Sequence, residues 1–220
     1  MKYHFKLLLS AGVLATSLGI QGAHAAKTSM TIALQLEPPH LDPTSAAAGA
    51  IDSVLYSNVF EGLTRFASDG AVIPGLAKSW EISEDGTEYI FHLNSAVTFH
   101  DGSTMDANDV KFSLDRARAE DSTNAQKALF SGIKNVEVLA SDKVKVTLAS
   151  PNGSFLFNMA WGDAVIVAPE TIDDIKTNPV GTGAFKFSNW VQGDKIELLR
   201  NEEYWGCLLY TSPSPRDRIR

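Results

Sequence analysis

The hydrophobic residues of this chain recur at every second position in several short segments, which is the spacing of half-buried β-strands. Tyr89, Phe91 and Leu93 follow this spacing. Three pairs of such segments are separated by turn-forming residues and therefore predict β-hairpins. The pairs are 80–82 with 89–91 around Glu84-Asp85-Gly86, 136–138 with 144–148 around Ser141-Asp142, and 185–187 with 196–198 around Gln192-Gly193-Asp194.

Hydrophobic residues spaced three and four apart predict two helices. Asp106 has the character of a helix N-cap, and Asp109 places a second carboxylate at the positive end of the same helix. The apolar residues of that helix are Val110, Leu114 and Ala117. A second helix is predicted over residues 52–65 by the spacing of Val54, Leu55, Val59 and Leu63.

Two further segments, Thr28–Leu36 and Ala164–Ala168, have the composition of strands. Pro38 and Pro39 end the first, because proline lacks the backbone donor that a strand needs. Several hairpins combined with two or three helices predict an α/β fold with mixed sheets.

The chain is acidic, with 19 basic and 26 acidic residues and a net charge of -7. Residues 1–25 and 207–220 contain five of the basic residues and one of the acidic residues, which leaves 14 basic and 25 acidic residues and a net charge near -11 for the body. Nucleic acids and anionic lipids require a basic surface. The charge therefore argues against both as partners and is typical of a soluble acidic surface.

Residues 1–25 have the pattern of a secretory signal peptide. Lys2 and Lys6 precede an apolar segment at 7–20, which is shorter than the roughly 20 residues of a membrane span. Ala23-His24-Ala25 fits a signal-peptidase site, so we expect cleavage after Ala25 and export to the periplasm. An uncleaved anchor is the alternative.

Candidate catalytic and metal-binding residues are few. Cys207 is the only cysteine, which excludes an intrachain disulfide and a cysteine-type metal site. His92 and His100 flank a strand and a turn, but alternation places His92 on the solvent side, and a turn role is favoured for His100. The HExxH, GxSxG and Walker motifs are absent. We therefore expect no enzyme activity, no cofactor and no metal.

Four stretches occur in a characteristic order along the chain. They are LDP at 41–43, NVFEGLTRF through DGAVIPGLAKSWEIS at 58–83, FHL through DVKFSLDR at 91–116, and NPVGTGAFKFSNWVQGDKIELLRNEEYWG at 178–206. Together they resemble the family 5 extracellular solute-binding proteins, the receptors of ABC importers for peptides, nickel chelates and related solutes. A departure occurs at Leu93-Asn94-Ser95-Ala96, where the family usually has Leu-Arg-x-Gly.

The resemblance implies a periplasmic binding protein of the type II-like plan, with two lobes and a smaller extra domain. It assigns residues 26–60 and 169–206 to lobe I and residues 61–168 to the extra domain, and it implies that the C-terminal lobe is missing from this sequence. Residues 207–220 change to a Ser-, Pro- and Arg-rich composition, and we interpret them as a foreign tail. A genuine disordered terminus is the alternative.

Five residues are candidates for ligand binding. In the family, the loop after LDP approaches the solute, which implies Ala48, Gly49 and Ala50, and small residues let a ligand approach the backbone closely. A plain surface loop is an equal alternative. Trp161 and Gly162 are also candidates, because aromatic walls suit apolar ligand groups. A core position is the alternative for Trp161.

The resemblance implies a receptor that traps a solute between its lobes by hinge closure and presents it to a membrane permease. The expected ligand is a short peptide held through its backbone, and the sequence LEPPHLDP favours a peptide receptor over a nickel receptor. We expect a monomer. A secreted hydrolase and a chaperone-like or chemoreceptor-docking protein remain the alternatives.

Overall fold

The computed structural model describes residues 29–45 and 48–206. The chain divides into two compact units, Met1–Ala33 and Leu34–Arg220, and the helices and strands described below belong to the second. The predicted signal peptide and the predicted foreign tail lie outside the described residues.

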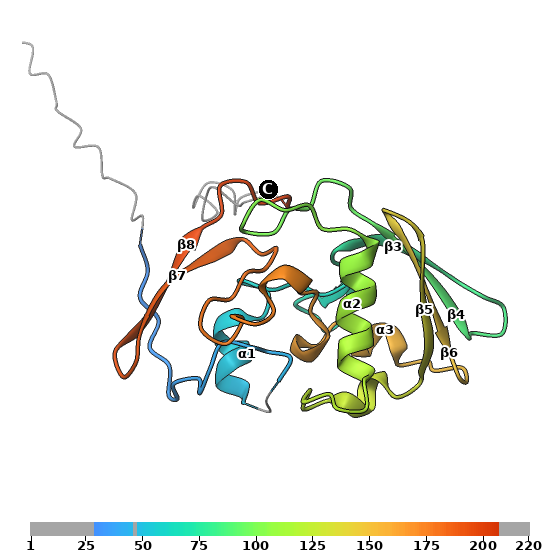
Figure 1. The fold of residues 1–220 in the computed structure, drawn as a ribbon, viewed down its shortest axis with the longest axis horizontal. Coiled ribbons are helices and arrows are strands. Elements are labelled where there is room, and N and C mark those ends of the chain that lie inside the picture. The colour runs from blue at the N-terminus through green and yellow to red at the C-terminus, as the bar shows by residue number, and fades with distance from the viewer. Residues whose placement is uncertain (1–28, 46–47, 207–220) are drawn as a thin grey trace, which may run out of the picture. The chain divides into compact units, whose positions relative to one another are not determined.

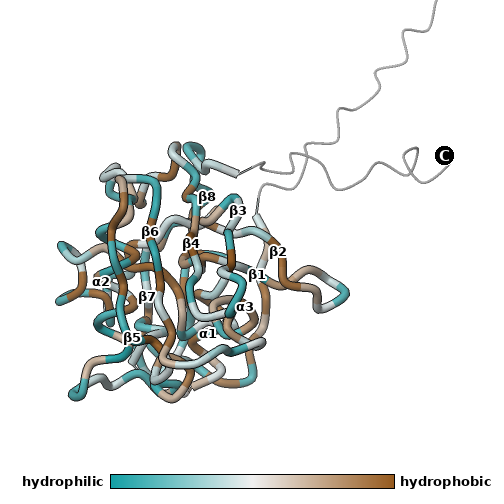
Figure 2. The backbone as a smooth tube through the Cα atoms, turned by 90° about the vertical axis from the view of Figure 1, so that its right-hand side faces the viewer, coloured by the Kyte–Doolittle hydropathy of each residue, from teal (hydrophilic) through white to brown (hydrophobic). Residues whose placement is uncertain are grey.

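A four-stranded antiparallel sheet forms the larger part of the fold. Its strands are β3 (Ala77–Ile82), β4 (Glu88–Leu93), β5 (Ile133–Ala140) and β6 (Lys143–Leu148), in the order β3-β4-β6-β5. Buried and more exposed positions alternate along β4 and β6, and Figure 2 shows both hydrophobic and hydrophilic residues in the strands of this sheet. The helix α2 (Ala107–Arg118) lies against this sheet (Figure 1) and shares its hydrophobic core.

Two smaller hairpins complete the strands. β1 (Thr64–Phe66) pairs with β2 (Val72–Pro74), and β7 (Phe185–Val191) pairs with β8 (Lys195–Arg200). All three predicted hairpins are therefore confirmed. Gly86 and Gly193 have φ of 69° and 77° at their turns, a conformation that glycine adopts without steric cost. Among the described strands all pairing is antiparallel, and parallel pairing is limited to an isolated bridge between Tyr56 and Phe60.

The remaining helices are short. They are α1 (Gly49–Leu55), α3 (Phe155–Asn158) and the 3-10 helices Lys127–Phe130, Gly162–Ala164 and Pro169–Thr171.

The start of α2 confirms the predicted N-cap. The Asp106 carboxylate accepts a hydrogen bond from the backbone N–H of Asn108 at 2.6 Å. The Asp109 carboxylate in turn accepts one from the backbone N–H of Asp106 at 2.8 Å, which completes a capping box. Arg116 and Arg118 lie in the last turn, where positive charge complements the helix dipole.

The predicted helix at 52–65 is wrong in its bounds. The observed helix, α1, ends at Leu55, and Thr64 already belongs to β1. The chain leaves the helix because Tyr56 is extended and Ser57 has φ of 59°, in the left-handed region. Val59 is nevertheless fully buried, so the helical spacing of apolar residues reflects burial and not a continuous helix.

The two other predicted strands are also wrong. Residues 29–36 form no strand, and no described segment pairs with them. Residues 164–168 form only an isolated bridge between Val165 and Gly62. Their backbone groups find other partners, because Ile166 N–H donates to the Glu61 carbonyl at 2.9 Å and Val167 N–H donates to Ser113 Oγ at 3.0 Å.

Two hydrophobic cores meet at residues 164–168. Ala164, Ile166 and Ala168 pack into the larger core with the four-stranded sheet and α2. Val165 and Val167 pack into a second core, which is built from α1, residues 59–60 and Ile175 and is flanked by side chains of β7 and β8. Alternate side chains of this segment therefore enter different cores, and both of its faces are buried.

The Glu61 carboxylate joins three segments that are distant in the sequence. Its Oε1 accepts a hydrogen bond from the Tyr204 hydroxyl at 2.7 Å. Its Oε2 accepts from Trp205 Nε1 at 2.9 Å and from Thr182 Oγ1 at 3.0 Å. Burial raises the pKa of Glu61, and the three donors oppose that shift. This carboxylate thus joins residues 204–205 and Thr182 to the segment that precedes β1.

Candidate ligand-binding site

The structure brings together the two segments that contain the predicted ligand-binding residues. Gly162 packs on the Asp52 side chain, and a Cβ added at Gly162 would lie 2.5 Å from Asp52 Oδ1. The Tyr56 hydroxyl donates a hydrogen bond to the Ala160 carbonyl. The helix α1 and the turn at 160–164 are therefore adjacent, and Asp52 and Tyr56 make the contacts between them.

The three small residues lie at the start of α1. Ala48 is the N-cap residue and supplies no side-chain hydrogen bond, and Ala48 and Ala50 are half-buried. Gly49 is exposed, and a Cβ added there would meet no atom within 4 Å. The opposite face of the helix is buried in the second core through Ile51, Val54 and Leu55. The start of α1 is thus anchored on one face and open on the other.

Trp161 is not a core residue, because 40% of its surface is exposed. Its ring meets the ring of Phe157 edge-on, with centroids 6.2 Å apart. Phe157 in turn contacts Phe66 of β1, with centroids 4.9 Å apart. Gly162 beside Trp161 is buried and opens a 3-10 helix. Trp161 therefore ends a row of three aromatic rings, and this row suits apolar groups of a ligand. Its role in binding stays a prediction.

Two carboxylates at this place were not among the sequence candidates. Asp163 follows Gly162 and is only 7% exposed, and burial together with the nearby Asp52 carboxylate raises its pKa to about 6. Burial also raises the pKa of Asp52. The available sequence signal was weak. It consisted of one acidic residue within the apolar start of a helix and another after Trp-Gly.

His92 and His100 both make contacts within the fold. His92 Nε2 lies 2.7 Å from Glu81 Oε1 on the four-stranded sheet. His100 Nε2 lies 2.9 Å from the Gly183 carbonyl, and His100 Nδ1 accepts from Gly181 N–H at 3.3 Å, which requires the neutral tautomer with the proton on Nε2. Within residues 29–45 and 48–206, no group of three or more His, Cys, Asp or Glu residues could hold a metal ion.

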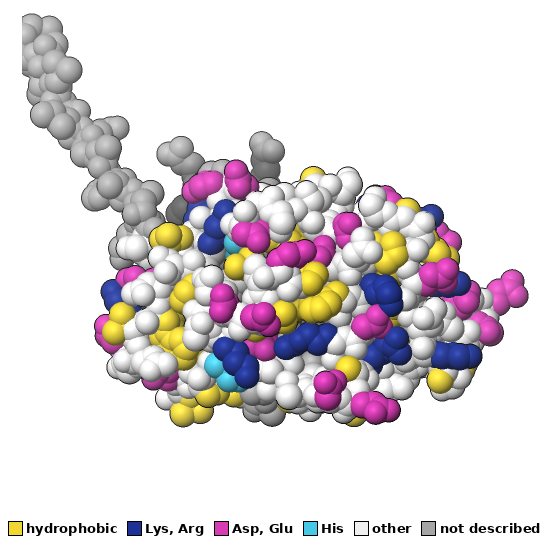
Figure 3. All heavy atoms as spheres, viewed as in Figure 1, with side chains coloured by type: hydrophobic (Ala, Val, Ile, Leu, Met, Phe, Trp, Pro, Cys, Tyr) yellow, Lys and Arg dark blue, Asp and Glu magenta, His cyan; other side chains and the backbone are white. Residues whose placement is uncertain are grey.

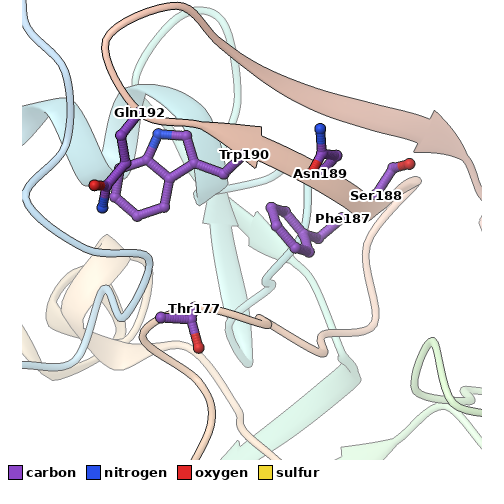
Figure 4. Close-up of a pocket in the computed structure, with 6 residues that line it drawn as sticks. All are labelled: Thr177, Phe187, Ser188, Asn189, Trp190 and Gln192. Carbon is purple, nitrogen blue, oxygen red and sulfur yellow. The ribbon is translucent and has the colours of Figure 1, made fainter.

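Two open hollows lie elsewhere on the surface. One, of about 470 Å³, is lined by Thr177, Phe187, Ser188, Asn189, Trp190 and Gln192 (Figure 4). The other, of about 320 Å³, is lined by Thr44, Arg116, Ala119, Asp121, Ser122 and Thr123. Neither includes a predicted ligand-binding residue.

The surface carries both signs of charge. Figure 3 shows acidic and basic side chains interspersed with hydrophobic ones over the face turned to the viewer. In the described part of the chain, no helix is both long enough and apolar enough to cross a membrane.

Comparison with known proteins places these features in a family. The model of the bacterial extracellular solute-binding proteins, family 5 middle region, matches residues 71–217. The glutathione-binding protein GsiB of Pectobacterium atrosepticum is 34% identical over 202 residues, which cover 90% of this chain and 39% of the relative. The chain therefore spans about two fifths of the length of this relative. The match of the family model extends into the tail at 207–220, whose foreign origin stays a prediction.

Two solved structures have a similar fold. The periplasmic binding protein DppA of Helicobacter pylori, in complex with the peptide STSA, is 30% identical, with a TM-score of 0.69 over 78% of this chain and 38% of that one. NikZ of Campylobacter jejuni, in complex with Ni(L-His), is 32% identical, with a TM-score of 0.70 over 77% of this chain and 35% of that one. The predicted fold class and the resemblance are thus confirmed: the chain belongs to the bacterial extracellular solute-binding proteins of family 5.

Proposed function

We propose that this chain is part of the substrate-binding component of an ABC importer, which captures a short peptide or a related solute and delivers it to the membrane permease. Family membership carries the proposal. The glutathione-binding and peptide-bound relatives favour a peptide ligand. The proposal contains no catalytic step. Its domain plan is lobe I from residues 26–60 and 169–206, with residues 61–168 as an extra domain.

The proposed ligand contacts are the open start of α1 at Ala48, Gly49 and Ala50, together with Trp161 and Gly162. Their support is the adjacency of α1 and the turn at 160–164 and the exposure of Trp161. A second lobe would close over this surface, because hinged receptors bury most of a small ligand between two walls.

Calorimetric titration of the protein in its complete form with dipeptides, glutathione and nickel-histidine tests the proposal. Trp161→Ala should weaken the binding of the preferred solute about 10-fold or more. Leu199→Ala serves as the control, since Leu199 is 60% exposed on β8 and is not one of the candidate residues. Nickel-histidine as the preferred ligand would favour the alternative nickel receptor. Hydrolysis of the peptides during the titration would favour the alternative hydrolase.

Export is part of the same proposal. Residues 1–25 would be removed as a signal peptide, and the mature monomer would act in the periplasm. Amino-terminal sequencing of the exported protein should begin at Ala26. An intact Met1 terminus in the membrane fraction would contradict cleavage.

A further inference from the structure

Asn152 and Gly153 lie just before α3 and are the only Asn-Gly pair in the sequence. Gly153 is exposed, and a Cβ added there would meet no atom within 4 Å, so the space around its backbone is open. The side-chain amide of an asparagine can react with the backbone nitrogen of the next residue. Glycine hinders this approach least, because it has no Cβ.

The backbone nitrogen of Gly153 makes no hydrogen bond within the part of the chain that the structure describes. Three Asp-Gly pairs offer the same ring-forming chemistry. In all three, a backbone carbonyl holds the glycine N–H at 2.9 Å: Ala67 holds Gly70, Ser83 holds Gly86 and Phe99 holds Gly102. A nitrogen that donates a hydrogen bond must break it before it can attack. Of these four pairs, Asn152-Gly153 alone therefore has a nitrogen that is ready to react.

The side-chain amide of Asn152 is held in a way that favours attack on its carbon. Asn152 Oδ1 accepts a hydrogen bond from Ser154 N–H at 3.0 Å. This donor supports the negative charge that develops on Oδ1 when a bond forms at Cγ. Asn152 Nδ2 makes no hydrogen bond with any described residue and is not enclosed, so it can leave into solvent.

We propose that Asn152 is a site of spontaneous modification, at which the side-chain amide cyclises onto Gly153 and then opens to aspartate or isoaspartate. Both reacting groups belong to neighbouring residues, which makes the attack far faster than attack by an external nucleophile. Water is the only co-reactant. The inference does not depend on the proposed function.

The reaction balances with one water consumed and one ammonia released. The Gly153 nitrogen loses its proton to hydroxide and bonds to Asn152 Cγ. The Cγ–Nδ2 bond then breaks, and Nδ2 takes up a proton and leaves as ammonia, which closes a cyclic imide. Water opens this ring at Cγ to give aspartate, or at the main-chain carbonyl carbon of residue 152 to give isoaspartate. Neither route involves oxidation or reduction.

The two products differ in what they do to the fold. The main-chain carbonyl of Asn152 accepts hydrogen bonds from the Tyr89 hydroxyl at 3.2 Å and from Phe155 N–H at 3.1 Å. Aspartate leaves this carbonyl in place. Isoaspartate directs the chain through Cγ and turns the carbonyl into a side carboxylate, so both contacts are displaced. Phe155 is buried with its ring centroid 4.7 Å from that of Tyr89, and isoaspartate should therefore loosen α3 from the core.

The test incubates the complete protein at mildly alkaline pH and maps its peptides by mass spectrometry. The peptide that contains residue 152 should lose its amide with time and separate into two isomeric acids. The rate should rise about 10-fold with each pH unit, because the deprotonated fraction of a weak acid far below its pKa rises by that factor. Asp69, Asp85 and Asp101 should remain ordinary aspartates, and the amide of Asn135, which precedes Val136, should persist.

Two variants check the route and its consequence. Gly153→Ala should retain the Asn152 amide, because the added Cβ fits the open space but hinders the attack. If this variant does not fold, Asn152→Gln supplies the same comparison, since its longer side chain closes a less favourable ring. Asn152→Asp should keep the melting temperature of fresh protein, whereas aged protein that contains isoaspartate should melt at a lower temperature.

A synthetic peptide of residues 149–157 sets the time scale. An Asn152 amide that stays intact in the protein while this peptide is converted would overturn the inference. Isoaspartate forming equally fast at residue 69, 85 or 101 would also overturn it, because the unbonded nitrogen of Gly153 would then make no difference. Equal conversion of the wild type and Gly153→Ala would exclude cyclisation onto this nitrogen. Equal melting of fresh and isoaspartate-containing protein would refute the predicted effect on α3.

Discussion

Replacing Glu61 by alanine should clearly lower the free energy of unfolding. The substitution removes the acceptor of three hydrogen bonds, from Thr182, Tyr204 and Trp205. Each donor left without a partner costs on the order of 1 kcal/mol. Loss of the carboxylate also relieves its own desolvation, so we expect a decrease of about 2–3 kcal/mol in the free energy of unfolding.

Replacing Glu61 by glutamine should cost much less. The amide oxygen can occupy the place of Oε2, where it still accepts from Thr182 and Trp205, while the amide nitrogen donates to the Tyr204 hydroxyl. A hydroxyl can reverse its role, whereas an indole N–H cannot. All three contacts therefore survive, and the loss should stay at or below about 1 kcal/mol.

Urea unfolding followed by circular dichroism measures both variants, with Glu84→Ala as the control. Glu84 is exposed in the turn between β3 and β4, and its loss should change the free energy of unfolding by less than about 0.5 kcal/mol. The reasoning fails if Glu61→Ala behaves like this control. It also fails if Glu61→Gln is as destabilising as Glu61→Ala.

Three further predictions concern stability. Asp106→Ala should cost about 1 kcal/mol of unfolding free energy through loss of the capping box, with solute affinity unchanged in calorimetry. Burial lowers the pKa of His100 below 6.5, so the neutral side chain should stabilise the fold fully above pH 6.5. This contribution should fall as the pH drops toward the lowered pKa. His100→Gln should therefore flatten this part of the pH profile of the free energy of unfolding, measured with urea. Gly181→Ala would place a Cβ 2.0 Å from the Val59 carbonyl oxygen and should lower the melting temperature strongly, whereas Gly132→Ala, with no atom within 4 Å, should not.

The hairpins and the start of α2 could be predicted because their signals are local. Alternation and a turn residue such as Gly86 lie within about ten residues of each other, and the capping box spans residues 106–109. The end of α1 could not be predicted, because Val59 and Leu63 continue the helical spacing of apolar residues. Both side chains are buried, but they belong to a turn and a loop and not to the helix.

The candidate site was predictable only in part. Trp161 and Gly162 were identified by residue type, and the small residues at 48–50 by the resemblance. The burial of Asp163 and its approach to Asp52 depend on the packing of the turn at 160–164 against α1. That contact joins residues more than 100 positions apart. A single sequence carries no direct signal for such a contact, and an acidic residue is by default expected on the surface.

The segment at 164–168 has a consequence for how the protein melts. Neighbouring side chains, such as Val165 and Ile166, belong to different cores, while one short stretch of backbone supports both. Heat should therefore release the two cores in a single calorimetric transition, because neither can lose this segment and leave the other intact. A fragment that is cut out with its end at residue 168 would remove buried side chains from both cores.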